Sequence, residues 1–459
     1  MKRILVANRG EIAVRILRTC AAMGIETVLA VSEADRDSAG SRLADHTVCV
    51  GPSRASHSYL RREALVAAAL HYECDGIHPG YGFLAESAEF AELCAESGIT
   101  FIGPSPAMLR LFGDKISARE AARSAGVPVS SGSPASAALA DALEHAHQIG
   151  YPVMLKATKG GGGKGMRIVH DDEQLAADLP MARAEAEASF GDGSVFLERW
   201  VGSARHVEVQ VAGSRSGEVI HLGDRDCTVQ RHHQKLVEEA PAPSIQPDVQ
   251  DAIRQAAVDL CRHVGYDNVG TVEFLLDTER GEFFFLEVNP RIQVEHGVTE
   301  LITGIDIVGL QIDIASTGRV GRTQEDITFD GCALQCRVNA EQPRRGFAAS
   351  PGRITTFDLP ASSDVRVDTH CFPGYLVPPY YDSLLAKVMV HAPDRSRAIE
   401  RMRATLVDAA IEGVDTTLEL SSWVVGSEDF RDVRISTRWL DHHLVDGSWP
   451  GPGAPPVPG

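Results

Sequence analysis

The pattern of apolar and polar positions predicts that the chain begins as a doubly wound α/β domain. Residues 3–7 form a short apolar run typical of a buried strand, and a helical pattern with Ile12 and Ile16 on one face follows. Residues 27–31 form a second apolar run. Strand, helix and strand joined by short connections are typical of doubly wound sheets. We therefore place an α/β domain at residues 1–113.

Two apolar runs, at 271–276 and 283–288, flank a Glu-Arg-Gly turn and predict a β-hairpin. The register that we expect from the turn pairs Asp277 with Phe283, Leu275 with Phe285, and Glu273 with Glu287. Alternation in a strand then puts both glutamates on one face together with Asn289. Carboxylates directly opposite each other repel. We therefore predict a Mg²⁺ or Mn²⁺ ion held by Glu273, Glu287 and Asn289; a hairpin with a solvated face is the alternative.

Four consecutive glycines, 160–163, lie between predicted strands at 151–157 and 166–169. Such glycines let backbone N–H groups approach phosphate oxygens closely. The segment is not a Walker loop, because Gly165 stands where that motif needs Ser or Thr and a strand follows where a helix should. We predict a mobile flap that closes over a nucleotide. A plain flexible loop remains the alternative.

Two further segments carry polar side chains in patterns that suggest a site. Residues 205–211 alternate, with valines on one face and His206, Glu208 and Gln210 on the other, a face that either lines a site or meets water. Residues 225–235 gather arginine, histidine and lysine, which suggests an anion site. Cys227 has no base at motif spacing, so we interpret it as a small core residue.

The composition is that of an ordinary, acidic globular protein. The 459 residues are 44% hydrophobic and 23% charged, which predicts two or three domains. The formal net charge of −19 argues against nucleic acid or an anionic membrane as partner. We expect no membrane span and no signal peptide. Nine cysteines without paired spacing favour reduced thiols, and together these features predict a cytoplasmic protein.

Eight longer segments carry a more specific signal. They are NRGEIAVRIL (8–17), HPGYGFLAES (78–87), KATKGGGGKGMR (156–167), RHVEVQV (205–211), RDCTVQRHHQKLVEEAPAP (225–243), FLEVNPRIQVEH (285–296), CRVNAE (336–341) and PGYLVPPYYDSLLAK (373–387). Together they closely resemble biotin carboxylase, and the resemblance extends to about Leu444.

The resemblance implies an ATP-grasp fold. It implies an N-terminal doubly wound α/β domain at 1–113, an ATP-grasp domain at 114–330 with a mobile lid at about 131–203, and an α+β C-terminal domain at 331–446. The Gly- and Pro-rich residues 447–459 read as a disordered tail.

The resemblance also implies a reaction in which ATP phosphorylates bicarbonate to carboxyphosphate and N1′ of biotin is then carboxylated. The implied ATP-binding residues are Lys115, Lys156, Gly162, Gly163, Glu198, Arg199, Trp200, Val201, His206, Gln230, His233, Glu273 and Glu287. Glu273, Glu287 and Asn289 match the metal ligands, with about two Mg²⁺ or Mn²⁺ ions per site. Lys235, Arg291, Gln293 and Val294 match the bicarbonate-binding residues, Glu295 the base, and Arg337 the cation beside the biotin enolate.

The chain carries no AMKM-type biotinylation motif and no carboxyltransferase segment, so we expect a separate biotin carboxyl carrier protein and separate carboxyltransferase subunits. The expected enzyme is a bacterial-type acetyl-CoA carboxylase of fatty acid synthesis. The alternatives are another acyl-CoA, pyruvate or urea carboxylase, an ATP-grasp ligase with a different acceptor, or a non-catalytic ATP sensor. The resemblance further implies a homodimer, with Arg15 and Arg18 in the contact helix.

Overall fold

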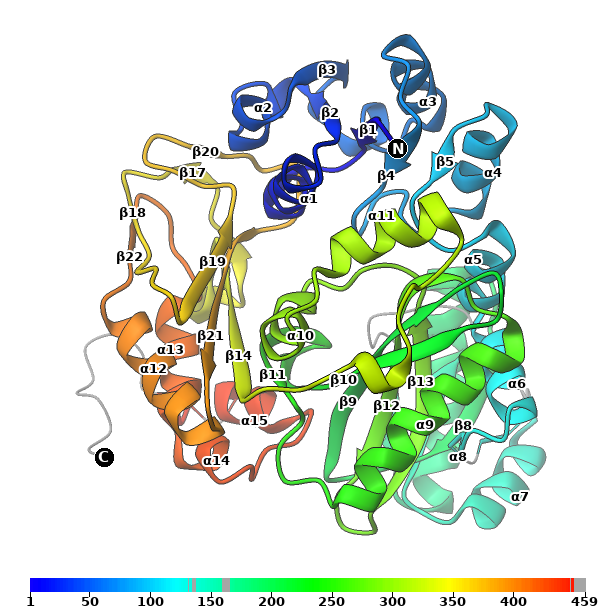
Figure 1. Ribbon diagram of the computed structural model, residues 1–459. Coiled ribbons are helices and arrows are strands. Elements are labelled where there is room, and N and C mark those ends of the chain that lie inside the picture. The colour runs from blue at the N-terminus through cyan, green and yellow to red at the C-terminus, as the bar shows by residue number, and fades with distance from the viewer. Residues whose placement is uncertain (131, 134–137, 159–165, 446, 450–459) are drawn as a thin grey trace.

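The N-terminal domain is built on a parallel sheet. A computed structural model describes residues 1–459 except 131, 134–137, 159–165, 446 and 450–459. The sheet has the strand order β3-β2-β1-β4-β5 (Figure 1). Its strands are β1 (Arg3–Val6), β2 (Glu26–Ser32), β3 (His46–Gly51), β4 (Gly76–His78) and β5 (Thr100–Phe101), and its helices are α1 (Gly10–Ala22), α2 (Ala39–Leu43), α3 (Arg62–His71) and α4 (Ala88–Glu96), with single 3-10 turns η1 (Glu33–Asp35) and η2 (Ala55–His57).

Both faces of this sheet are covered, which confirms the predicted doubly wound domain. Ile4 and Val6 on β1 pack in one apolar cluster with Ile12 and Ile16 of α1. Leu5, the residue between them, points to a second cluster that contains side chains of α3 and α4. Alternation along a single buried strand therefore supplies two cores.

A small three-stranded sheet of order β7-β6-β8 follows, and the predicted glycine flap between β6 and β7 falls on residues 159–165, outside the described residues. Helices α5 (Pro106–Gly113) and α6 (Lys115–Ser124) lead to it, and the Asp114 side chain caps α6 by accepting a hydrogen bond from the Ser117 N–H at 2.8 Å. The elements of this part are α7 (Leu139–Ile149), β6 (Val153–Ala157), β7 (Arg167–Val169), α8 (Asp172–Phe190) and β8 (Val195–Arg199). Gly162 and Gly163 lie outside the described residues.

The central element is an antiparallel eight-stranded sheet of order β13-β12-β9-β10-β11-β14-β21-β19. Its strands are β9 (Ala204–Gly213), β10 (Val219–Arg231), β11 (Gln234–Ala240), β12 (Asn268–Asp277), β13 (Glu282–Asn289), β14 (Cys332–Asn339), β19 (Val365–Thr369) and β21 (Leu384–Ala392), and helices α9 (Pro247–Val264), α10 (His296–Thr303) and α11 (Ile307–Thr317) pack against it or the N-terminal domain. Strands β14, β19 and β21, which follow residue 330, join the same sheet as β9–β13, so the regions before and after residue 330 share one scaffold.

The C-terminal region completes this sheet and adds short elements. These are η3 (Gln324–Asp326), β15 (Glu341–Gln342), η4 (Pro343–Arg345), β16 (Ala348–Ala349), β17 (Gly352–Arg353), β18 (Thr356–Asp358), β20 (Leu376–Val377), α12 (Arg395–Val407), β22 (Ala410–Glu412), α13 (Leu418–Gly426), α14 (Glu428–Arg431) and α15 (Trp439–Val445). Trp449, which composition assigned to a disordered tail, instead packs on the apolar cluster beside α15, under the Arg344 guanidinium. Residues 450–459 of the predicted tail lie outside the described residues.

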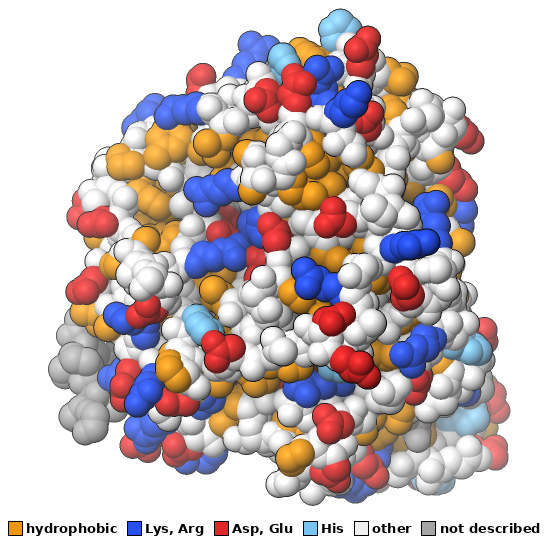
Figure 2. Space-filling view, viewed as in Figure 1, with side chains coloured by type: hydrophobic (Ala, Val, Ile, Leu, Met, Phe, Trp, Pro, Cys, Tyr) orange, Lys and Arg blue, Asp and Glu red, His pale blue; other side chains and the backbone are white. Residues whose placement is uncertain are grey.

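Charged side chains of both signs share the face of the molecule seen in Figure 2. Figure 2 shows acidic and basic side chains interspersed over the visible face rather than separated into fields. No helix among the described residues is long and apolar enough to cross a membrane.

Candidate active site

The predicted pair of facing glutamates is present on the β12–β13 hairpin, but the register near the turn differs from our prediction. Asp277 faces Glu282 rather than Phe283, and Leu275 faces Phe284 rather than Phe285. A β-bulge next to Glu273 then restores the expected Glu273–Glu287 pair, because Leu286 has no partner and is 40% exposed. The bulge turns an apolar side chain outward and keeps both carboxylates on the site face.

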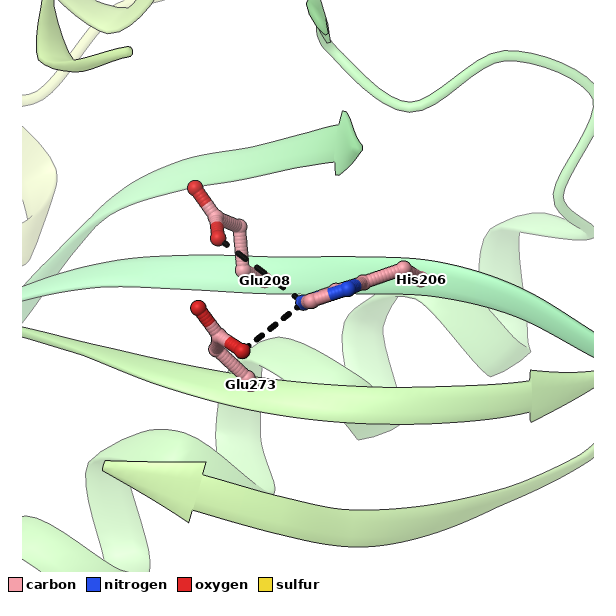
Figure 3. Close-up of side chains that lie close together, drawn as sticks. All are labelled: His206, Glu208 and Glu273. Atoms are coloured by element: carbon pink, nitrogen blue, oxygen red, sulfur yellow. Dashed lines mark ion pairs between the residues drawn. The ribbon is translucent and has the colours of Figure 1, made fainter. Parts of the chain in front are cut away.

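Glu273 is the centre of a buried polar cluster. One of its oxygens accepts hydrogen bonds from Lys235 Nζ at 2.8 Å, Asn289 Nδ2 at 2.9 Å and Gln293 Nε2 at 3.2 Å. The other oxygen lies 2.9 Å from His206 Nε2 (Figure 3). The polar face of β9, for which the sequence left two options, is therefore buried and lines a site.

The donor set fits a divalent cation. Glu287 faces Glu273, and burial together with that neighbouring charge raises the pKa of the Glu287 carboxyl. Burial opposes charge on His206 as well, yet the Glu273 carboxylate prevails and raises the pKa of His206. Carboxylates from adjacent strands and the Asn289 amide supply the hard oxygen ligands that Mg²⁺ and Mn²⁺ prefer. A cation there would relieve the repulsion between the two carboxylates.

Lys235 joins this cluster to the predicted base. Its ammonium donates to Glu208 at 2.5 Å, to Glu273 at 2.8 Å and to Glu295 at 2.7 Å. Glu295 is fully buried. Burial alone would raise its pKa, but the charges of Lys235, Arg337 and Arg225 hold the pKa of the Glu295 carboxyl well below its usual range. These cations therefore favour the carboxylate form of Glu295.

Arg337 reaches the same carboxylate from β14. Its Nη2 donates to Glu295 at 2.9 Å, and its Nε donates to Glu238 at 2.5 Å. Gln335 donates to the second oxygen of Glu238 at 3.0 Å. Sequence reasoning missed Glu238, because the segment around it looks like the end of an ordinary strand. The acidic side chain lies on β11, which pairs with the Arg337 strand β14, but that pairing is not visible in the sequence.

The other predicted bicarbonate-binding residues lie in the loop between β13 and α10. Arg291 donates to Asn289 Oδ1 at 3.0 Å and to Gln293 Oε1 at 2.9 Å, and it also pairs with Glu86 of the N-terminal domain. Val294 immediately precedes Glu295 in the chain. The structure thus brings together all four residues that the sequence assigned to bicarbonate, next to Glu295.

On the nucleotide side the agreement is less complete. The Glu198 carboxylate is bound by Lys156 and Arg119, and these cations lower the pKa of Glu198 despite burial; its predicted contact with ATP stays a prediction. Arg199 forms ion pairs with Asp277 at 3.5 Å and Glu282 at 3.1 Å, which connect β8 to the β12–β13 hairpin.

The remaining predicted nucleotide residues surround the same region. Trp200 lies under the Arg438 guanidinium, Val201 is buried, and Gln230 Nε2 is 3.4 Å from His206 Nδ1. His233 is exposed in the β10–β11 turn with φ of 67°. Lys115 lies close enough to Glu287 to oppose the rise of its pKa.

A fully buried arginine beneath the site was also missed by sequence reasoning. Arg225 on β10 donates to Glu208 at 2.5 Å, to Gln210 at 2.8 Å, to Thr299 at 2.9 Å and to Thr271 at 3.1 Å. Arg225 and Lys235 both donate to Glu208, so Arg225 fixes the carboxylate that Lys235 binds. Nothing in the local sequence distinguishes Arg225 from a surface arginine.

The structure also shows the surroundings of Cys227 and of the two α1 arginines, Arg15 and Arg18. Cys227 is buried, and burial raises the pKa of its thiol well above the usual range, which agrees with a core residue rather than a nucleophile. Arg15, which lies in the helix predicted to form the subunit contact, is buried within the chain and pairs with Glu300 and Asp306, both at 2.8 Å; the contact itself stays a prediction. Arg18 is exposed.

Comparisons with known proteins agree with this geometry. Family models described as "Biotin carboxylase, N-terminal domain", "Carbamoyl-phosphate synthase L chain, ATP binding domain" and "Biotin carboxylase C-terminal domain" match residues 1–109, 114–322 and 335–442. The chain is 44% identical to Biotin carboxylase 1 of Bacillus subtilis, over 98% of this chain and 100% of that protein.

Solved structures give the same result. The biotin carboxylase–β,γ-ATP complex from Campylobacter jejuni superposes with a TM-score of 0.91 at 43% identity, covering 96% of this chain and 99% of that one. The biotin carboxylase domain dimer of Hydrogenobacter thermophilus 2-oxoglutarate carboxylase, in complex with MgADP, ADP and bicarbonate, gives 0.89 at 44% identity, covering 96% and 97%.

Proposed function

Since the chain belongs to the biotin carboxylase family, we propose that it is the biotin carboxylase subunit of a bacterial-type acetyl-CoA carboxylase. Family membership makes the protein an ATP-dependent carboxylase ligase and a biotin carboxylase subunit of a biotin-dependent carboxylase. The finer assignment is supported by the full-length match to a protein named simply biotin carboxylase. In this role it carboxylates biotin on a separate carrier protein, which then serves separate carboxyltransferase subunits.

The observation that carries the proposal is the convergence of Lys235 and Arg337 on the buried Glu295. A carboxylate kept ionised by two cations can accept the bicarbonate proton while a bicarbonate oxygen attacks the γ-phosphorus of ATP, with ADP as the leaving group. The products of this step are carboxyphosphate and ADP. Lys235, Arg291, Gln293 and the Val294 backbone hold the bicarbonate anion, because a cationic and amide-rich pocket offsets its charge.

Arg337 serves the second half of the reaction. Carboxyphosphate breaks down to CO₂ and phosphate, and the phosphate takes the proton from biotin N1′. The resulting negative charge on the ureido oxygen needs a fixed cation. Glu238 holds Arg337 through Nε, so the guanidinium is oriented before biotin arrives. The enolate nitrogen then attacks CO₂ to give carboxybiotin.

The nucleotide and its counter-ions occupy the adjoining part of the site. We assign Glu273, Glu287 and Asn289 as ligands for Mg²⁺ or Mn²⁺. The positive charge of the cation would offset the negative charge of the triphosphate. The H. thermophilus relative, described with MgADP, supports this assignment. Lys115, Lys156, His206 and His233 complete the proposed phosphate-facing set.

The test is ADP release by the purified protein with Mg²⁺ and ATP, with and without bicarbonate and free biotin. We expect turnover that requires bicarbonate and is stimulated by biotin, and a loss of that stimulation in Arg337→Ala. The matched control is Arg401→Ala, since the exposed Arg401 forms an ion pair with Asp364 on the surface, away from Glu295. Turnover that needs bicarbonate but ignores biotin would leave an ATP-grasp ligase with another acceptor. Nucleotide binding without turnover would favour an ATP sensor.

The final acceptor is the finer question. The similarity to a 2-oxoglutarate carboxylase domain, at 44% identity, favours a 2-oxo acid carboxylase as the second candidate. The choice can be tested by adding biotinylated carrier proteins and carboxyltransferases of each class to this subunit and measuring ¹⁴C-bicarbonate incorporation into acetyl-CoA, pyruvate or 2-oxoglutarate. Incorporation into acetyl-CoA alone supports the proposal. Incorporation only into an oxo acid overturns it. Sedimentation of the same preparation tests the proposed homodimer.

A further inference from the structure

A fully buried lysine with no assigned role lies where three parts of the molecule meet. Lys387 on β21 has an exposed fraction of 0%. Its ammonium is 3.1 Å from the Glu11 carboxylate on α1 and 3.7 Å from the Asp368 carboxylate on β19. It also donates a hydrogen bond to the carbonyl oxygen of Val294 at 3.0 Å. One side chain thus connects the N-terminal domain, the C-terminal region and the loop before α10.

The carbonyl that Lys387 holds belongs to the peptide unit that leads into Glu295. Because a peptide unit is planar, fixing the Val294 oxygen also fixes the direction of the Glu295 N–H and limits where the Glu295 side chain can point. A second contact acts on the preceding unit, since His296 Nδ1 lies 2.7 Å from the carbonyl oxygen of Gln293. Burial lowers the pKa of His296 well below its usual range, so a neutral ring donates from Nδ1. The carbonyl groups of Gln293 and Val294, the two residues before Glu295, are therefore both hydrogen-bonded.

Stability alone does not account for a buried charge at this position. Replacing a buried ion pair with apolar side chains of similar volume is often neutral or stabilising. An apolar residue in place of Lys387 would still fill the core between β14 and β19, but it would leave the Val294 carbonyl without a donor. The ammonium group is therefore best explained by the loop that it holds.

We propose that Lys387 is a positioning residue of the bicarbonate half-reaction. It fixes the Val294–Glu295 peptide relative to the N-terminal domain and β19, and so sets the geometry of the bicarbonate-binding loop and the base. This inference rests on the proposed function, which assigns bicarbonate to that loop. Lys387 itself touches no substrate in this account and acts through the backbone of Val294.

The test compares two variants that differ only at Lys387. Glu11→Gln keeps the Lys387 ammonium and its hydrogen bond to the Val294 carbonyl. Glu11→Gln combined with Lys387→Met removes one carboxylate and one ammonium, so the net charge is that of the unmodified protein. Asp368 remains neutralised in both, because Arg366 donates to it at 3.0 Å and 2.7 Å. We expect the double variant to raise the KM for bicarbonate roughly tenfold or more above that of Glu11→Gln, with the KM for ATP within about twofold. Hydrogen exchange in a peptide spanning 293–300 should be faster in the double variant only.

The outcomes separate this inference from the proposed function. An unchanged bicarbonate KM, or an equal loss for bicarbonate and ATP, would overturn the positioning role. If the double variant does not fold, Lys387→Arg carries the same test, because the charge is kept but the planar guanidinium cannot reproduce the ammonium contacts. If the unmodified protein shows no bicarbonate-dependent turnover, the proposed function fails, while unchanged exchange in residues 293–300 would refute the Lys387 contact independently of activity.

Discussion

Glu238 provides a sharp test of how the site prepares Arg337 for biotin. It is fully buried, and it binds Arg337 Nε and Gln335 Nε2 through its two oxygens. Glu238→Gln preserves the shape of the side chain and removes its charge. The amide oxygen can accept from Arg337 Nε only as a neutral group, so the charge-assisted bond that orients Arg337 becomes a weaker, partly neutral one.

The magnitude follows from the kind of bond that is lost. A hydrogen bond to a charged group contributes about 1.5–3 kcal/mol and a neutral one about 0.5–1.5 kcal/mol, so the difference is about 1.5 kcal/mol. That difference corresponds to about a tenfold fall in kcat/KM for biotin. Burial raises the pKa of Glu238 even with Arg337 beside it. Removing one partner of a buried ion pair costs about 3–5 kcal/mol, but Arg337 keeps Glu295 as a second partner at 2.9 Å, so we expect the free energy of unfolding to fall by less than that.

The assay is ADP release at saturating ATP and bicarbonate as free biotin is varied. Glu239→Gln is the matched control, because Glu239 is also buried and binds an arginine, Arg395 at 2.6 Å and 3.0 Å, next to Glu238 in the same strand. We expect only Glu238→Gln to lower kcat/KM for biotin. Equal effects of the two substitutions, or an equal loss in kcat/KM for bicarbonate, would refute the view that Glu238 orients Arg337.

Three further predictions follow from the structure. Glu295→Gln removes the proposed base but not its shape, so ADP release should fall at least about a hundredfold while calorimetry shows unchanged ADP binding; activity above a tenth of normal would contradict the assignment. Burial lowers the pKa of His370 to about 3, so stability should be complete above the unfolded pKa of about 6.5 and fall by roughly 4 kcal/mol as pH drops towards 3. Thermal melts of His370→Gln should lose this part of the pH dependence, and an identical slope would refute it. In Gly270→Ala the new Cβ would lie 2.1 Å from Tyr266 Oη, so urea unfolding should show a loss of about 1–3 kcal/mol; an unchanged midpoint would mean that the ring moves aside.

Much of the fold and site was accessible from sequence because strand periodicity is a local property. The valine alternation of β9 predicted which side chains share a face, and the first apolar runs predicted the parallel sheet of the N-terminal domain. Motif resemblance then identified the residues that meet around Glu295. The Glu273–Glu287 pair was predicted from an incorrect register, since no local signal marked Leu286 as the extra residue of a bulge. Whether a strand bulges depends on what its two faces contact, and those contacts form only in the folded protein.

The order of residues establishes which side chains are available and which of them share a strand face, because the alternation of a strand is set by neighbouring residues. Which distant groups neutralise one another depends on how the chain folds. Arg15 is internal because α10 and α11 return to α1, and Lys387 meets Glu11 and Val294 because three regions close around it. Charges separated by hundreds of residues interact strongly only when folding brings them together and removes water, so their pairing cannot be read from local pattern.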